Sequence, residues 1–99
     1  MTLRETLAQR LEIVARIATA TSALQKLGQQ RAAAEMDVLR CEMAARQEPS
    51  GQLAPDLLDA RSRVAECDAG VERCEAQIEA LETALAGVDR EIAADARRE

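Results

Sequence analysis

Apolar residues recur along both halves of the chain at alternating spacings of three and four, which is the heptad pattern of a coiled-coil seam. In the second half the register covers twelve positions, all apolar except the last: Leu57, Ala60, Val64, Cys67, Val71, Cys74, Ile78, Leu81, Leu85, Val88, Ile92 and Asp95. The first half has a matching register with one charged member: Ile13, Ile17, Ala20, Leu24, Leu27, Arg31, Ala34, Val38, Cys41 and Ala45. Each half therefore predicts one long helix with a single apolar stripe.

Start and stop signals divide the chain into these two helices. Thr2 followed by Glu5 is a capping box, so the first helix is expected to begin at about residue 3. Pro49 stops that helix, and Pro55 suits the first position of the next. The predicted organisation is a single domain over residues 1–99, with a helix at about 3–47, a turn at about 48–55 and a helix at about 56–97.

Folding the chain back at this turn brings the two seams together. We therefore predict an all-α fold, a long antiparallel two-helix coiled-coil hairpin that pairs with another hairpin or a partner helix into a bundle. Residues facing one another in this register include Ala45 with Ala60, Leu27 with Ile78 and, at the open end, Arg10 with Asp95.

Charged residues beside the seam give a weaker test of the same register. Glu42 is expected beside Arg61, and Arg16 beside Glu91, which are favourable pairs. The remaining flank pair, Glu35 with Asp68, is unfavourable because it sets two carboxylates side by side. Arg31 is one turn from Glu35 and could relieve this repulsion.

Composition agrees with helix-on-helix packing. The chain has no Phe, Tyr or Trp, so its interior must be built from aliphatic side chains. Its formal charge of −5 is unevenly divided: residues 1–47 carry seven basic and five acidic side chains, and residues 56–99 carry six basic and twelve acidic ones. The first half is therefore weakly basic and the second strongly acidic, which favours their attraction.

The first helix has more apolar surface than one seam needs. Leu7, Leu11, Val14 and Ala18 form a second stripe beside the seam, close to Leu3. These five residues are the candidate partner interface, because the extra stripe is confined to one end of the helix. The alternative is a broad seam covered by ordinary side chains.

Arg31 is the candidate for fixing register or oligomeric state, since it interrupts the apolar stripe, as buried polar residues do in some coiled coils. The simpler interpretation is that its stem packs along the seam while the guanidinium reaches Glu35, Glu75 or solvent.

Candidate chemistry is sparse. The chain has no histidine, no Gly-rich phosphate loop and no nucleophile motif, so we expect no enzyme activity, no cofactor and no metal. Cys67 and Cys74 share a helix face but are a heptad apart, about 10 Å along the axis, so they are expected to be structural thiols. An odd number of cysteines favours a reducing cytoplasm. No apolar run approaches the roughly 20 residues needed to span a bilayer, and the N-terminus does not fit a signal peptide.

These observations favour a non-catalytic scaffold, adaptor or assembly protein that acts through protein partners, as a homo-oligomer or as part of a hetero-oligomeric bundle. In architecture and composition, over most of its length, the chain resembles the coiled-coil stalk proteins of bacterial type III export systems, which implies a component of a secretion or export machine. The high ratio of arginine to lysine suggests a GC-rich bacterial genome. The alternative is a small dimeric nucleic-acid-binding regulator whose binding face would consist of Arg4, Arg10, Arg16, Lys26 and Arg31. This alternative is disfavoured because acidic residues are interspersed among these basic ones and the face has no aromatic side chain.

Overall fold

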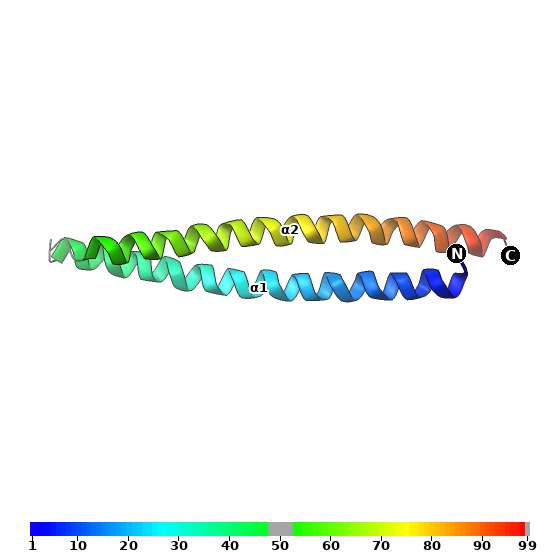
Figure 1. Ribbon diagram of the computed structural model, residues 1–99, viewed down its shortest axis with the longest axis horizontal. Helices are drawn as coiled ribbons and strands as arrows, with labels where there is room; N and C mark the ends of the chain where they lie inside the picture. The colour runs from blue at the N-terminus through cyan, green and yellow to red at the C-terminus, as the bar shows by residue number, and fades with distance from the viewer. Residues whose placement is uncertain (48–52, 99) are drawn as a thin grey trace. The chain divides into compact units, whose positions relative to one another are not determined.

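The computed structural model describes residues 1–47 and 53–98, and these residues form two helices that pack against each other (Figure 1). Helix α1 spans Leu3–Gln47 and helix α2 spans Leu53–Arg98. No strand occurs within this described part of the chain. The predicted all-α helical hairpin is thereby confirmed. The expected turn falls largely on residues 48–52, which lie outside the described residues, and α2 begins three residues before the expected start.

The helix ends follow from local chemistry. The Glu5 backbone N–H donates to Thr2 Oγ1 at 3.2 Å, so Thr2 caps α1 as its capping-box spacing predicts. Pro55 lies in the first turn of α2, where a missing backbone N–H costs no helical hydrogen bond. Asp56 in that turn, and two arginines in the last turn, complement the helix dipole.

All the residues assigned to the seam are buried or half-buried. The most deeply buried apolar members are small or aliphatic, so the seam is narrow and closely packed: Ile13, Ala20, Ala34, Ala60, Cys67 and Val88. Among the described residues, Thr6 is the one buried polar side chain, at 2% exposure, and its hydroxyl donates to the Thr2 carbonyl at 3.0 Å. It lies one heptad before Ile13 and extends the seam.

The chain divides into two compact units. The terminal unit comprises Met1–Ala23 and Cys74–Glu99, and the central unit comprises Leu24–Arg73. Each unit contains a segment of α1 beside a segment of α2. The expectation of a single domain over residues 1–99 stays a prediction.

The pairing of the two seams differs from the predicted register. In the central unit, a Cβ built on Gly70 would lie 3.1 Å from both terminal carbons of Leu27, so Leu27 lies beside Gly70 rather than the predicted Ile78. In the terminal unit, Arg10 Nε donates to Asp89 Oδ1 at 2.8 Å, so the predicted pair of Arg10 with Asp95 is wrong. Both differences amount to about one heptad.

The slip has a simple physical reason. Sliding one helix by seven residues returns every seam position to an equivalent one, so an apolar ladder alone cannot select between registers. The flank pairs respond unequally: Arg61 still reaches Glu42, at 3.3 Å, but Arg16 pairs with Glu12 of its own helix instead of the predicted Glu91.

Candidate partner-binding surface

An exposed row of aliphatic side chains runs along α1 in the terminal unit. Leu7 is 49% exposed, Leu11 is 71% exposed and Val14 is 38% exposed, and Ala18 is exposed as well. Their spacings of four, three and four residues place them on one helix face. We call these four residues the apolar row. They are four of the five residues that the sequence analysis proposes as a partner interface.

The fifth candidate, Leu3, lies elsewhere on the unit. It is 45% exposed and lines a hollow of about 380 Å³ at the end of the seam, together with Met1, Ile92 and Asp95. Leu3 occupies a seam position, two heptads before Ile17, rather than a position beside the seam. It therefore closes the end of the seam and does not extend the apolar row.

The charged residues of α1 near the apolar row lie at its end and along its edges rather than within it. Arg4, one turn before Leu7, is charged and exposed. From Leu7 onward the other residues on this helix face are small and uncharged, and all are exposed: Ala8, Ala15, Thr21 and Ser22. Arg10, at the edge of the row, is paired with Asp89 at 2.8 Å, and Glu12 and Arg16 are paired with each other at 2.8 Å. Small side chains beside larger aliphatic ones allow a second helix to approach closely. The face therefore has the chemistry of a helix-packing surface.

Arg31 lies at the seam of the central unit and joins two carboxylates. Its Nε donates to Asp68 Oδ1 and its Nη1 donates to Glu35 Oε1. The hydrogen bond and charge of Asp68, followed by the charge of Glu35, raise the pKa of the Arg31 guanidinium above its ordinary value. Because arginine is already protonated at working pH, this shift adds no pH dependence there. Arg31 thus relieves the repulsion between Glu35 and Asp68, while its role in register or oligomeric state stays a prediction.

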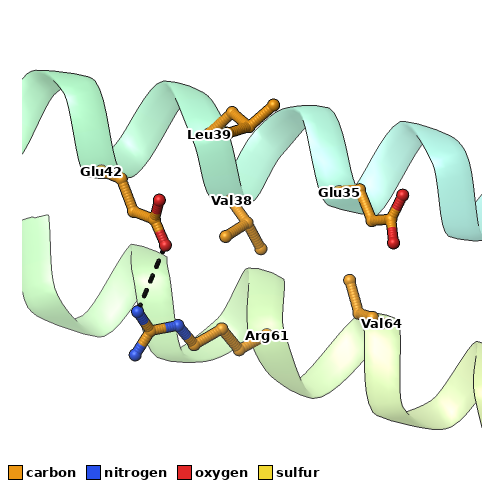
Figure 2. A pocket seen from close by; sticks show the side chains of 6 residues that line it. All are labelled: Glu35, Val38, Leu39, Glu42, Arg61 and Val64. Carbon is orange, nitrogen blue, oxygen red and sulfur yellow. Dashed lines mark hydrogen bonds and ion pairs between the residues drawn. The ribbon is translucent and has the colours of Figure 1, made fainter.

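A second exposed apolar patch lies on α1 in the central unit, and the sequence analysis missed it. Met36 is 52% exposed, Leu39 is 51% exposed and Met43 is 59% exposed. Beside them, a groove of about 420 Å³ is lined by Val38 and Val64 and crossed by the hydrogen bond between Glu42 and Arg61 (Figure 2). The 36, 39, 43 spacing marks this helix face, but it lies off the seam register in which the apolar pattern was traced.

Three of the five basic residues proposed as a nucleic-acid-binding face are engaged by acids. Arg10 pairs with Asp89, Arg16 with Glu12, and Arg31 with both Glu35 and Asp68. A guanidinium that already donates to a carboxylate offers less to a phosphate. The arrangement does not favour the nucleic-acid alternative.

The three cysteines lie along the seam. Cys67 is buried, Cys41 and Cys74 are half-buried, and all three are free thiols at seam positions. In the described ranges, 1–47 and 53–98, no cluster of three potential metal ligands occurs. Within these ranges neither helix contains a segment long and apolar enough to cross a membrane.

No family model, curated protein or solved structure matches the chain.

Proposed function

We propose that the chain is a non-catalytic coiled-coil scaffold, adaptor or assembly protein that binds a partner helix along the apolar row. The observation that supports this proposal is the exposure of Leu7, Leu11 and Val14 in one line, with only small uncharged side chains between them on that helix face. Large aliphatic side chains aligned at helical spacing fit the ridge of another helix. A partner would cover them as α2 covers the seam.

The energetics favour a weak contact at this row alone. Full burial of a leucine or valine side chain contributes about 1.5–3 kcal/mol, and these side chains are already partly covered. Association costs several kcal/mol in lost translational, rotational and side-chain freedom. We therefore expect a dissociation constant of roughly micromolar order for a short partner helix, and tighter binding where contacts continue beyond the row.

A bacterial secretion or export machine is the proposed setting, and the cytoplasm the proposed location. Both rest on the resemblance in architecture and composition to coiled-coil stalk proteins of type III export systems and on the odd number of cysteines.

A designed peptide tests the helix-binding proposal. The probe is a fluorescent amphipathic helix of about four heptads with leucine at its seam positions and only uncharged polar residues elsewhere. We expect saturable binding by fluorescence anisotropy, and loss of binding in the double variant Leu7→Glu, Leu11→Glu, because two carboxylates would then have to be buried.

Leu58→Glu provides the matched control. Leu58 is 65% exposed but lies on α2 in the central unit, so this variant adds an acid at an exposed leucine outside the apolar row. It should bind the probe like the unaltered chain, with unchanged helicity by circular dichroism. Absence of binding to the unaltered chain, or equal loss in the Leu58 variant, would contradict the proposal.

A further inference from the structure

We propose that the partner helix carries basic residues along one edge, because an acidic row on the neighbouring helix borders the same side of the seam as the apolar row and continues past the end of that row at Ala18. This inference rests on the proposed function and deepens it by specifying the chemistry of the partner. The acidic row consists of Glu75, Glu79, Glu82 and Asp89 of α2 in the terminal unit.

The central unit shows which residue positions share one side of the seam. Arg31, a seam residue, donates to Glu35 on α1 and to Asp68 on α2. A single guanidinium can reach both carboxylates only if they border the same side of the seam. Glu42 and Arg61, one heptad from these two acids in each helix, are also bonded to each other across the two helices.

The same heptad positions recur in the terminal unit. On α1, Leu7 and Val14 occupy the same heptad position as Glu35, four and three heptads before it. On α2, Glu82 and Asp89 occupy the same heptad position as Asp68, two and three heptads after it. Arg10, a seam residue beside the apolar row, donates to Asp89 just as Arg31 donates to Asp68. The apolar row on α1 and the acidic row on α2 therefore border the same side of the seam.

The acidic row is open to a partner. Glu75, Glu79 and Glu82 are exposed, and none of them forms an ion pair with another of the described residues. Asp89 is the exception, because Arg10 already neutralises it. Spacings of four and three residues between the three glutamates place them along one helix face, where their like charges repel. A cationic edge on a docked helix would remove that repulsion.

Charge also argues against a second copy of the chain as the occupant. Two copies packed through this side with their apolar rows in contact would bring their acidic rows close together as well. With the copies turned so that apolar meets acidic, leucines would face glutamates, which buries charge without a partner. A helix of another protein, apolar on one face and basic along the adjoining edge, satisfies both rows.

Three peptides that differ only in their edge residues test this inference by fluorescence anisotropy. All share the same leucine face, and their edges carry lysine, glutamine or glutamate. At low ionic strength we expect the lysine-edged peptide to bind about tenfold more tightly than the glutamate-edged one, since several exposed ion pairs contribute together. The difference should shrink in about 1 M salt, where the Debye length is near 3 Å.

Charge reversal assigns the preference to the acidic row. Glu79→Lys with Glu82→Lys should invert the order of the lysine-edged and glutamate-edged peptides. Glu66→Lys with Glu91→Lys changes net charge equally at two exposed α2 positions outside the acidic row, and should leave the order unchanged. Because all four sites are exposed on α2, lysine should be tolerated there, and circular dichroism checks that helicity is kept.

The outcomes separate this inference from the proposed function. Equal binding of all three peptides, with loss in the Leu7→Glu, Leu11→Glu variant, would overturn the acidic-row inference and leave helix binding intact. A lysine preference that survives reversal at Glu79 and Glu82 would also overturn it. No binding of any peptide would overturn the proposed function itself.

Discussion

Gly70 and Gly28 differ in what surrounds them, although both are helix-interior glycines of the central unit. A Cβ at Gly70 would lie 3.1 Å from both terminal carbons of Leu27, whereas a Cβ at Gly28 would meet no atom within 4 Å. Gly70 thus lets a leucine of α1 lie close against the backbone of α2. Gly28 carries the low helix propensity of glycine without a comparable packing reason.

The two alanine variants should therefore differ in stability. Gly28→Ala should raise the free energy of unfolding by about 0.8–1 kcal/mol, because alanine is the better helix former. Gly70→Ala gains the same propensity but must displace Leu27, so it should be about 1 kcal/mol less favourable than Gly28→Ala. Urea unfolding followed by circular dichroism measures both. Equal gains in the two variants would show that Leu27 does not pack on Gly70.

Arg31 can be tested through the salt dependence of its ion pairs. Arg31→Gln leaves Glu35 and Asp68 near each other without the guanidinium between them, so it should lower the thermal unfolding midpoint. The loss should be largest at low ionic strength and should diminish in about 1 M salt, where the repulsion is screened. Arg73→Gln, at an exposed arginine of the same unit, is the control. A loss independent of salt would indicate a packing role for the Arg31 stem instead.

At the scale of the helices, the register is open to a direct test by cysteine cross-linking. In a background with the native cysteines replaced, Leu27→Cys with Gly70→Cys should form an intramolecular disulfide under mild oxidation. The pair Ala45→Cys and Ala60→Cys should form a disulfide poorly, because these two positions face each other only in the register deduced from the sequence, one heptad away. Non-reducing electrophoresis of dilute samples gives the yields. The opposite order of yields would mean that the register deduced from the sequence is the true one.

The helices illustrate what periodicity can and cannot specify. Seam membership could be deduced residue by residue, because burial follows local spacing: Ile13, Ala20 and Val88 are buried where the heptads place them. Which residue of α1 faces which residue of α2 could not be deduced, because a slip of seven residues preserves every apolar layer. Thr6 was missed because it is polar, although its position continues the seam and its hydroxyl is satisfied by the preceding turn.

The candidate surface was only partly deducible from the sequence. The apolar pattern identifies Leu7, Leu11 and Val14 as residues that the seam does not need. It does not distinguish Leu3 from them, although Leu3 lies at the end of the seam. The sequence shows the acidic excess of the second half, of which the acidic row is a part. The sequence alone could not show that the acidic row lies on the same side of the seam as the apolar row, because this depends on which sides of the two helices meet. The ion pairs of Arg31 and Arg10 show which sides meet.

For the whole molecule, the acidic row predicts how the isolated chain associates. At low ionic strength, repulsion between acidic rows should keep the 10.7 kDa chain monomeric. Screening in about 1 M salt should promote association through the apolar row, and Leu7→Glu with Leu11→Glu should abolish that association. Light scattering coupled to size exclusion measures the mass. A stable dimer at low salt, unaffected by the Leu7 and Leu11 changes, would contradict this expectation.

The central claim, that the apolar row of the terminal unit receives a partner helix, is tested most directly by methyl NMR. The chain, labelled at Leu, Val and Met methyl groups, is titrated with the lysine-edged peptide. We predict that the largest shifts occur at Leu7, Leu11 and Val14, with the methyl groups of Met36 and Met43 unchanged. Shifts confined to the Met36 and Met43 patch, or no saturable shift at the apolar row, would contradict the account.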